Sequence, residues 1–117
     1  MRKITILLYI FITACQGIGV GNDVKIDRNP DHLIYTKHAR CRMGCRHIDE
    51  GEVQEILKNG TINYGKSEPA ARPDPKYAFE GTTHDNQKVR IVFAPSQRGT
   101  VVITVIDLGT EWSCDCR

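Results

Sequence analysis

Four cysteines in two closely spaced pairs are the residues of this chain with the clearest capacity for chemistry. Cys41 and Cys45 stand four residues apart in a segment that we expect to be helical, so both thiols lie on one face. Cys114 and Cys116 are two residues apart in an extended tail, where alternate side chains point to the same side. Because each pair presents two sulfurs together, we expect the pairs to meet in space.

Three chemical states remain open for these cysteines: two disulfides, a four-thiolate zinc site, or unrelated free thiols. Bridges within either pair are awkward, whereas bridges between the pairs close loops of about 70 residues, the first worth about 4 kcal/mol in the chain-entropy model. Zinc would accept four thiolates, or three with His38, but the spacings are not those of a usual zinc knuckle. Disulfides are favoured, structural zinc comes second and a redox-active pair third; we expect no other cofactor.

His38 is the one candidate for proton transfer. With Arg42 on the same segment and Arg90 on a predicted strand, it resembles a set that cleaves a phosphodiester without a metal. The alternative is a histidine that packs at a helix start and bonds to the backbone. No paired carboxylate or second well-placed histidine supports catalysis, so we assign no catalytic residue and keep these three as candidates.

The N-terminus has the pattern of an export signal. Arg2 and Lys3 precede an uncharged stretch, residues 4–14, which is too short to span a bilayer. Small residues then lead into Cys15, and the pattern resembles the lipobox of bacterial lipoproteins. That resemblance implies removal of residues 1–14, acylation of Cys15 and a membrane anchor in the cell envelope, facing the periplasm. Gln16 is not the acidic residue that retains such proteins in the inner membrane, which favours the outer membrane in a Gram-negative host.

The charge of the chain argues against a nucleic-acid partner. The sequence has 16 Lys and Arg against 14 Asp and Glu, and removal of Arg2 and Lys3 leaves 14 of each. A binder of phosphates usually shows a basic excess. A protein or a small molecule of unknown identity is the expected partner, besides the membrane.

The mature chain divides into a glycine-rich tether, residues 15–30, and one small domain, residues 31–117. Thr36 is placed to cap a helix over residues 37–45. Asp49 and Glu52 form a capping-box pattern for a second helix that ends at Asn59. Strands are expected at residues 33–35, 61–64, 77–82, 89–94 and 100–106, with a loop at 67–75 and a five-residue hairpin loop at 95–99. This order indicates an α+β domain: two short N-terminal helices packed on an antiparallel β-meander of three to four strands.

The domain resembles the family called domain of unknown function 4258 over residues 33–108. The motifs that carry the resemblance are TKHA at 36–39, Arg42-Met43, Arg46-His47-Ile48, RIVF at 90–93 and VITV at 102–105. The family is similar in fold to BrnT-type and RelE-like ribonuclease toxins, which implies helices on a curved antiparallel sheet. Fold alone does not carry function. The sequence also departs from a typical member in its export signal, paired cysteines and C-terminal tail. We therefore expect a binding or structural domain, with an exported ribonuclease-like effector acting on RNA as the alternative.

Overall fold

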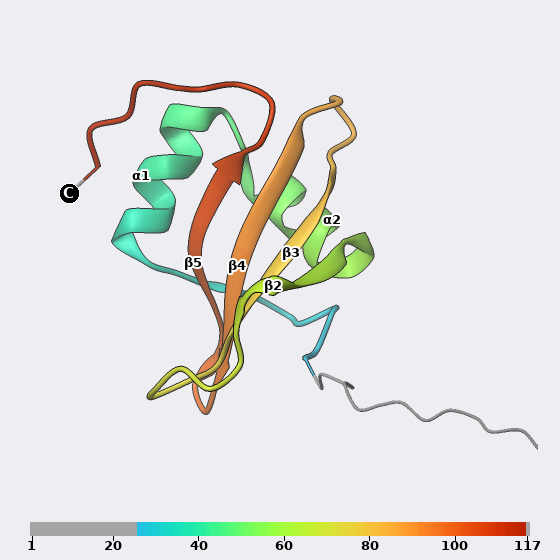
Figure 1. Ribbon diagram of the computed structural model, residues 1–117, viewed down its shortest axis with the longest axis vertical. Helices are drawn as coiled ribbons and strands as arrows, with labels where there is room; N and C mark the ends of the chain where they lie inside the picture. Colours follow the sequence, from blue (N-terminus) through green and yellow to red (C-terminus); the bar gives the residue numbers. More distant parts are fainter. Residues whose placement is uncertain (1–25, 117) are drawn as a thin grey trace, which may run out of the picture.

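The computed structural model describes residues 26–116, which form two helices and a five-stranded sheet (Figure 1). The elements are, in order, β1 (Ile34–Tyr35), α1 (Lys37–Arg46), α2 (Glu50–Asn59), β2 (Thr61–Glu68), β3 (Lys76–Thr82), β4 (Lys88–Ser96) and β5 (Gly99–Asp107). The α+β class expected from the sequence is confirmed.

The sheet is larger than expected and is mixed. Its strand order is β1-β5-β4-β3-β2, and β2 to β5 form the expected antiparallel meander. The correction concerns β1, which runs parallel to β5 and makes the fifth strand. The half-buried pair Ile34–Tyr35 lies opposite Val101 and Val102, and the Thr36 amide extends the contact to the Val102 carbonyl at 3.2 Å.

Both helices begin at the predicted caps. The Thr36 hydroxyl accepts from the Ala39 amide at 2.9 Å, and α1 continues one residue beyond the expected end. At α2 the Asp49 carboxylate accepts from the Glu52 amide, while the Glu52 carboxylate accepts from the Asp49 amide. This capping box satisfies two amides that a helix start would otherwise leave unpaired.

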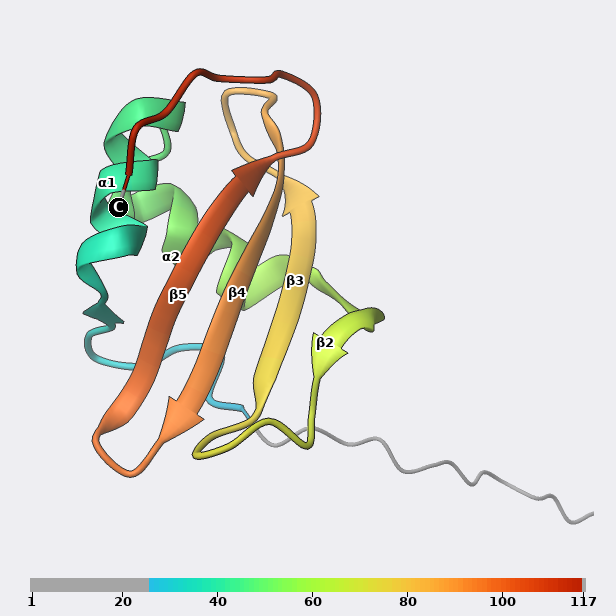
Figure 2. The same ribbon diagram turned by 60° about the vertical axis from the view of Figure 1, so that its left-hand side comes forward.

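The core lies between the two helices and one face of the sheet (Figure 2). α2 contributes Val53, Ile56 and Leu57 to it. The rings of Phe79 on β3 and Phe93 on β4 meet edge to face, with centroids 5.1 Å apart. The other face of the sheet is not covered by a helix within residues 26–116.

Two strand ends differ from the sequence prediction. The hairpin between β4 and β5 has a two-residue loop instead of five, because Pro95 pairs with Thr100 and Ser96 with Gly99. The β3 ladder ends at Phe93, so Pro95 lies where β4 has only β5 beside it. Gly99 takes the positive φ of 130° that the tight turn requires.

β2 extends beyond the predicted residues 61–64, into the segment expected to be a loop. Its pairing with β3 shifts between Asn63 and Glu68. Side chains bridge this gap: the Ser67 hydroxyl donates to the Asn63 carbonyl at 2.7 Å and accepts from the Ala78 amide at 2.9 Å. These bonds hold an extended backbone that has no clear hydrophobic period for sequence analysis to detect.

The contacts of the domain begin before residue 31, where the sequence analysis placed its start. Ile26 packs against the core, and Arg28 donates to the Leu57 and Gly60 carbonyls at 3.2 and 2.8 Å. The Arg28 guanidinium also lies 4.8 Å from the centre of the Phe79 ring. A cation at these carbonyls is favourable because they are the unpaired end of α2.

The predicted signal, residues 1–14, the lipidation residue Cys15 and the tether as far as residue 25 lie outside the described residues. None of the described helices has the length and apolar character that a membrane crossing demands.

Candidate functional site

The C-terminal tail, which we define as residues 108–116, crosses the end of the sheet and returns along α1 (Figure 2). Disulfides join Cys41 to Cys116 and Cys45 to Cys114, and both pairs have Cα atoms 5.8 Å apart. The earlier cysteine of α1 pairs with the later one of the tail, so the two segments run antiparallel. The two pairs meet as the sequence predicted.

The disulfide state leaves no thiolate for the zinc site considered above. Each of the four sulfurs is used in one of the two S–S bonds. His38, the further ligand considered, faces Thr104 of β5, with 3.2 Å between its Nε2 and the Thr104 hydroxyl. Within residues 26–116, no group of three or more His, Cys, Asp or Glu side chains is placed to hold a metal ion.

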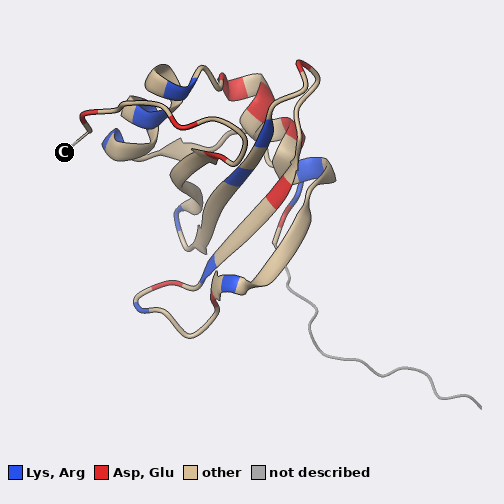
Figure 3. Cartoon of the chain, turned by 45° about the horizontal axis from the view of Figure 1, so that its top comes forward, with Lys and Arg blue, Asp and Glu red and all other residues tan. Residues whose placement is uncertain are grey.

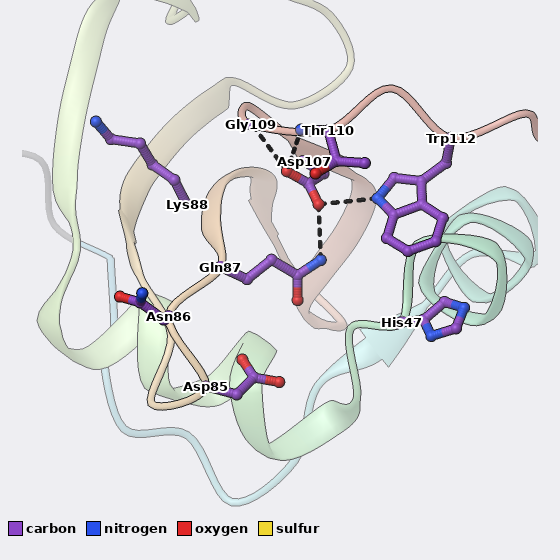
Figure 4. A pocket seen from close by; sticks show the side chains of 9 residues that line it. All are labelled: His47, Asp85, Asn86, Gln87, Lys88, Asp107, Gly109, Thr110 and Trp112. Carbon is purple, nitrogen blue, oxygen red and sulfur yellow. Dashed lines mark hydrogen bonds between the residues drawn. The ribbon is translucent and has the colours of Figure 1, made fainter.

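Asp107, the last residue of β5, is the polar centre of this end of the molecule (Figure 4). One carboxylate oxygen accepts from the Gly109 and Thr110 amides at 2.8 and 2.9 Å. The other accepts from Gln87 Nε2 at 2.9 Å and Trp112 Nε1 at 2.8 Å. Burial alone favours the neutral acid, but the four hydrogen bonds outweigh it and hold the pKa of Asp107 at about 2.

Trp112 connects the tail to α1 as well as to Asp107. Its ring stacks on His47, with centroids 4.6 Å apart and planes 18° from parallel. His47 is the residue at which α1 ends, and it takes a left-handed conformation with φ of 59°. That turn directs the imidazole toward the tail, so the helix end and the tail share one aromatic contact.

Two hollows flank Trp112, and both include Asp107 and Thr110 in their walls. The first, of about 340 Å³, is lined by His47 and by the turn between β3 and β4. The second, of about 530 Å³, is lined by Arg46 and Ile106 on the domain side and by the tail on the other. The tail therefore forms one wall of each hollow.

Arg46 is a site residue that the sequence analysis quoted in a motif but did not propose. Its guanidinium donates to the carbonyl of Val105. This residue lies beyond Val101 and Val102, the part of β5 with which β1 pairs. Burial lowers the pKa of Arg46, the nearby Arg42 lowers it further, and Asp107 opposes both. The i, i+4 spacing of the two arginines on α1 is the signal that was available.

The structure brings two of the three sequence candidates, His38 and Arg90, to one side of the sheet without assembling a catalytic group. Arg90 pairs with Ile106 in register, two residues from the Thr104 that His38 contacts, so both lie toward the uncovered face. Arg90 is bound to the Glu80 carboxylate at 2.6 Å, and this bond lowers the pKa of Glu80. The Arg42 Nε atom is buried and has no hydrogen-bond partner among the described residues.

Charges of both signs are distributed over this side of the molecule. Figure 3 shows acidic residues on α2, the sheet and the tail, whereas the charged residues of α1 are all Lys or Arg. This distribution does not form a uniformly basic face.

Comparison with known proteins identifies the family of this fold. No curated protein and no solved structure matches the chain. Residues 35–107 match a family model described as Domain of unknown function (DUF4258), and this span runs from β1 to the last residue of β5. It covers more than half of the chain and ends where the tail begins, and the chain belongs to this family.

Proposed function

We propose that the chain is an exported, lipid-anchored protein of the bacterial cell envelope, whose domain binds a partner or has a structural role. The observation that carries the proposal is the pair of disulfides between α1 and the tail. Disulfides persist in oxidising compartments such as the periplasm and are rare in the cytosol. The export pattern of residues 1–14 and the placement of Cys15 agree with that compartment.

The anchor would hold the domain near the bilayer. Contacts with the domain begin at Ile26, so ten residues separate the domain from the proposed lipid on Cys15. A flexible chain of this length has an r.m.s. span of about 17 Å. The side of the domain near the C-terminal end of α2, where Arg28 binds, would then lie closest to the membrane.

The side-chain contacts support binding over cleavage. His38 contacts the hydroxyl of Thr104, which is not the carboxylate that usually orients a catalytic imidazole. Arg90 is already engaged by Glu80, so its charge is largely offset before any ligand arrives. A ligand of this domain would meet a surface of mixed charge.

Membrane fractionation tests the anchor. The unchanged chain is expected in the membrane fraction, and the chain with Cys15→Ser is expected to keep its signal or to be released. Cys41→Ser is the matched control, since it removes a cysteine that is not in the signal. Equal membrane attachment of a Cys15→Ser protein from which residues 1–14 have been removed would contradict the anchor.

An exported ribonuclease-like effector of the RelE or BrnT type is the second candidate. It is favoured by one observation, the placement of His38 and Arg90 toward the same uncovered face. The test is cleavage of RNA by the full chain in the presence of a chelator. Cleavage that His38→Ala abolishes and His32→Ala leaves unchanged would support this candidate over binding; absence of cleavage would remove it.

A further inference from the structure

The tail is separable from the rest of the domain. The family match ends at Asp107, so residues 108–116 lie beyond the element set that defines the family. The buried hydrophobic residues of the described chain all precede residue 108, and the tail has no regular secondary structure. The tail therefore contributes no buried residue to the apolar core.

Covalent bonds and one aromatic residue hold the tail against α1. The two disulfides fix its last three described residues, and a contact of 3.6 Å joins Cys45 Sγ to the Ser113 carbonyl. Trp112 provides the stacking on His47 and a hydrogen bond to Asp107. A single indole contact of this kind is weak beside a cross-link, so the disulfides decide whether the tail stays in place.

The disulfides are accessible to an external thiol. Cys41 is exposed, and the other three cysteines are half-buried. An attacking thiolate needs access to one sulfur of the bridge, which makes Cys41–Cys116 the first bond within its reach. Opening it frees residues 115 and 116 from α1, and that in turn gives access to Cys45–Cys114.

We propose that residues 108–116 are a redox-released strap: a dithiol reductant opens Cys41–Cys116 and then Cys45–Cys114, and the freed tail uncovers the hollow formed by Arg46 and Ile106. In each step a thiolate of the reductant attacks one sulfur and the other sulfur leaves as a thiolate. The second thiol of the reductant resolves the mixed disulfide. Two electrons and two protons pass to each cysteine pair, and the reductant becomes a disulfide.

Release changes the chemistry of the surface beneath the strap. Arg46 and Ile106 lose the tail as the opposite wall of their hollow, so a cation and an apolar side chain become available together. Asp107 loses the Trp112 hydrogen bond but keeps the one from Gln87 within the domain. The oxidised and reduced proteins would thus present different binding surfaces on the same core. The proposal does not depend on the lipid anchor.

The test uses the full chain with Cys15→Ser, so that the four domain cysteines are the only thiols. Trp112 is the single tryptophan of the sequence, and its emission reports the position of the tail. Addition of dithiothreitol is expected to shift that emission to longer wavelength and to raise the hydrogen-exchange rate of the Gly109 and Thr110 amides. Exchange of amides in β3, β4 and β5 is expected to stay slower than exchange in the tail.

Two variants separate the covalent from the aromatic contribution. In oxidised protein with Trp112→Ala, the disulfides are expected to keep the tail next to α1, so proteolysis within residues 108–116 stays slow until a reductant is added. The protein with Cys45→Ser and Cys114→Ser is expected to release its tail when the remaining bridge is reduced. Slow exchange of the tail after full reduction would overturn the proposal. Simultaneous loss of protection in β3 to β5, in the parent and this variant alike, would overturn it as well, because the bridges would then hold the whole fold.

Discussion

The core of this domain and its tail acquire order in different ways. In the core, β3, β4, β5 and the two helices exclude water from a cluster in which Phe79 and Phe93 make contact. Each fully buried side chain of this kind stabilises the fold by about 1.5–3 kcal/mol. In the tail, no residue is buried; its position is fixed by two disulfides, by Trp112, and by backbone amides that bond to Asp107. The core is held by solvent exclusion, and the tail by cross-links and one carboxylate.

The difference indicates which properties belong to the family and which to this chain. The family match covers the core from residue 35 to residue 107, while the tail adds one wall to two hollows at the end of the sheet. Substitutions in the core should act on global unfolding. Substitutions in the tail, apart from those of its cysteines, should act on local position and on the surface around Asp107.

The largest expected effect is in the core. Phe79→Ala removes a fully buried ring from β3 and leaves a cavity beside Phe93, so we expect a loss of about 3–5 kcal/mol in the free energy of unfolding. Urea denaturation measures it. The matched control is Leu108→Ala in the tail, where 39% exposure limits the expected change to about 0.5 kcal/mol. Equal losses for the two variants would erase the distinction between core and tail.

The next effect concerns the cross-links. In the protein with Cys45→Ser and Cys114→Ser, the bridge between Cys41 and Cys116 still spans 75 residues, so only the short loop between the two bridges is freed. We expect the free energy of unfolding to fall by about 2 kcal/mol. Removal of the last remaining long-range bridge should lower it by about 4 kcal/mol. Urea denaturation of the single- and double-bridge variants gives both values. Equal losses on removal of the first and of the second bridge would show that the bridges act independently.

Acid is expected to weaken the link between core and tail at Asp107. Its folded pKa of about 2 lies below the unfolded value, so the stabilisation is fully present above about pH 4 and is lost as the pH falls toward 2. The contribution is about 1–2 kcal/mol after allowance for partial exposure. We expect Asp107→Asn to reduce the slope of unfolding free energy against pH between 5 and 2. An unchanged slope in that variant would assign the acid sensitivity to other carboxylates.

The smallest expected effect is at the start of α1. Thr36→Ala removes the bond from the Ala39 amide and the bond to the Ile103 carbonyl, so we expect a loss of about 1 kcal/mol. Thr36→Ser is the control, because its hydroxyl can still make both bonds. Chemical denaturation of the two variants should separate them, and equal stability would mean that the cap contributes nothing to α1.

Local signals in the sequence identified much of the core. The hydroxyl of Thr36 and the Asp49–Glu52 pair predicted two helix starts that the structure confirms. Runs of β-branched residues predicted β4 and β5. The parallel pairing of β1 could not be predicted in the same way, because two residues carry too little pattern to specify which strand they join.

The sequence predicted that the cysteines of the tail meet those of α1, but it did not predict the polar contacts of the tail. Cys41 and Cys45 lie on one face of a helix, and the two tail cysteines lie on one side of an extended segment. Each pair therefore presents two sulfurs together, which indicated that the pairs meet. Which cysteine joins which depends on chain direction, a tertiary property. Asp107 followed by Gly109 and Thr110 is a local signal for side-chain bonds to nearby amides, whereas its bonds to Gln87 and Trp112 join residues that only the fold brings together.

The most direct test of the account is the mass of the full chain with Cys15→Ser, purified from the cell envelope without chelator or reductant. Two disulfides predict a denatured mass four hydrogens below that of the fully reduced chain, no thiol open to alkylation, and recovery of the four hydrogens on reduction. A native mass one zinc heavier, with four thiols alkylatable after denaturation, would contradict the disulfide-held tail and identify the same four cysteines as a metal site.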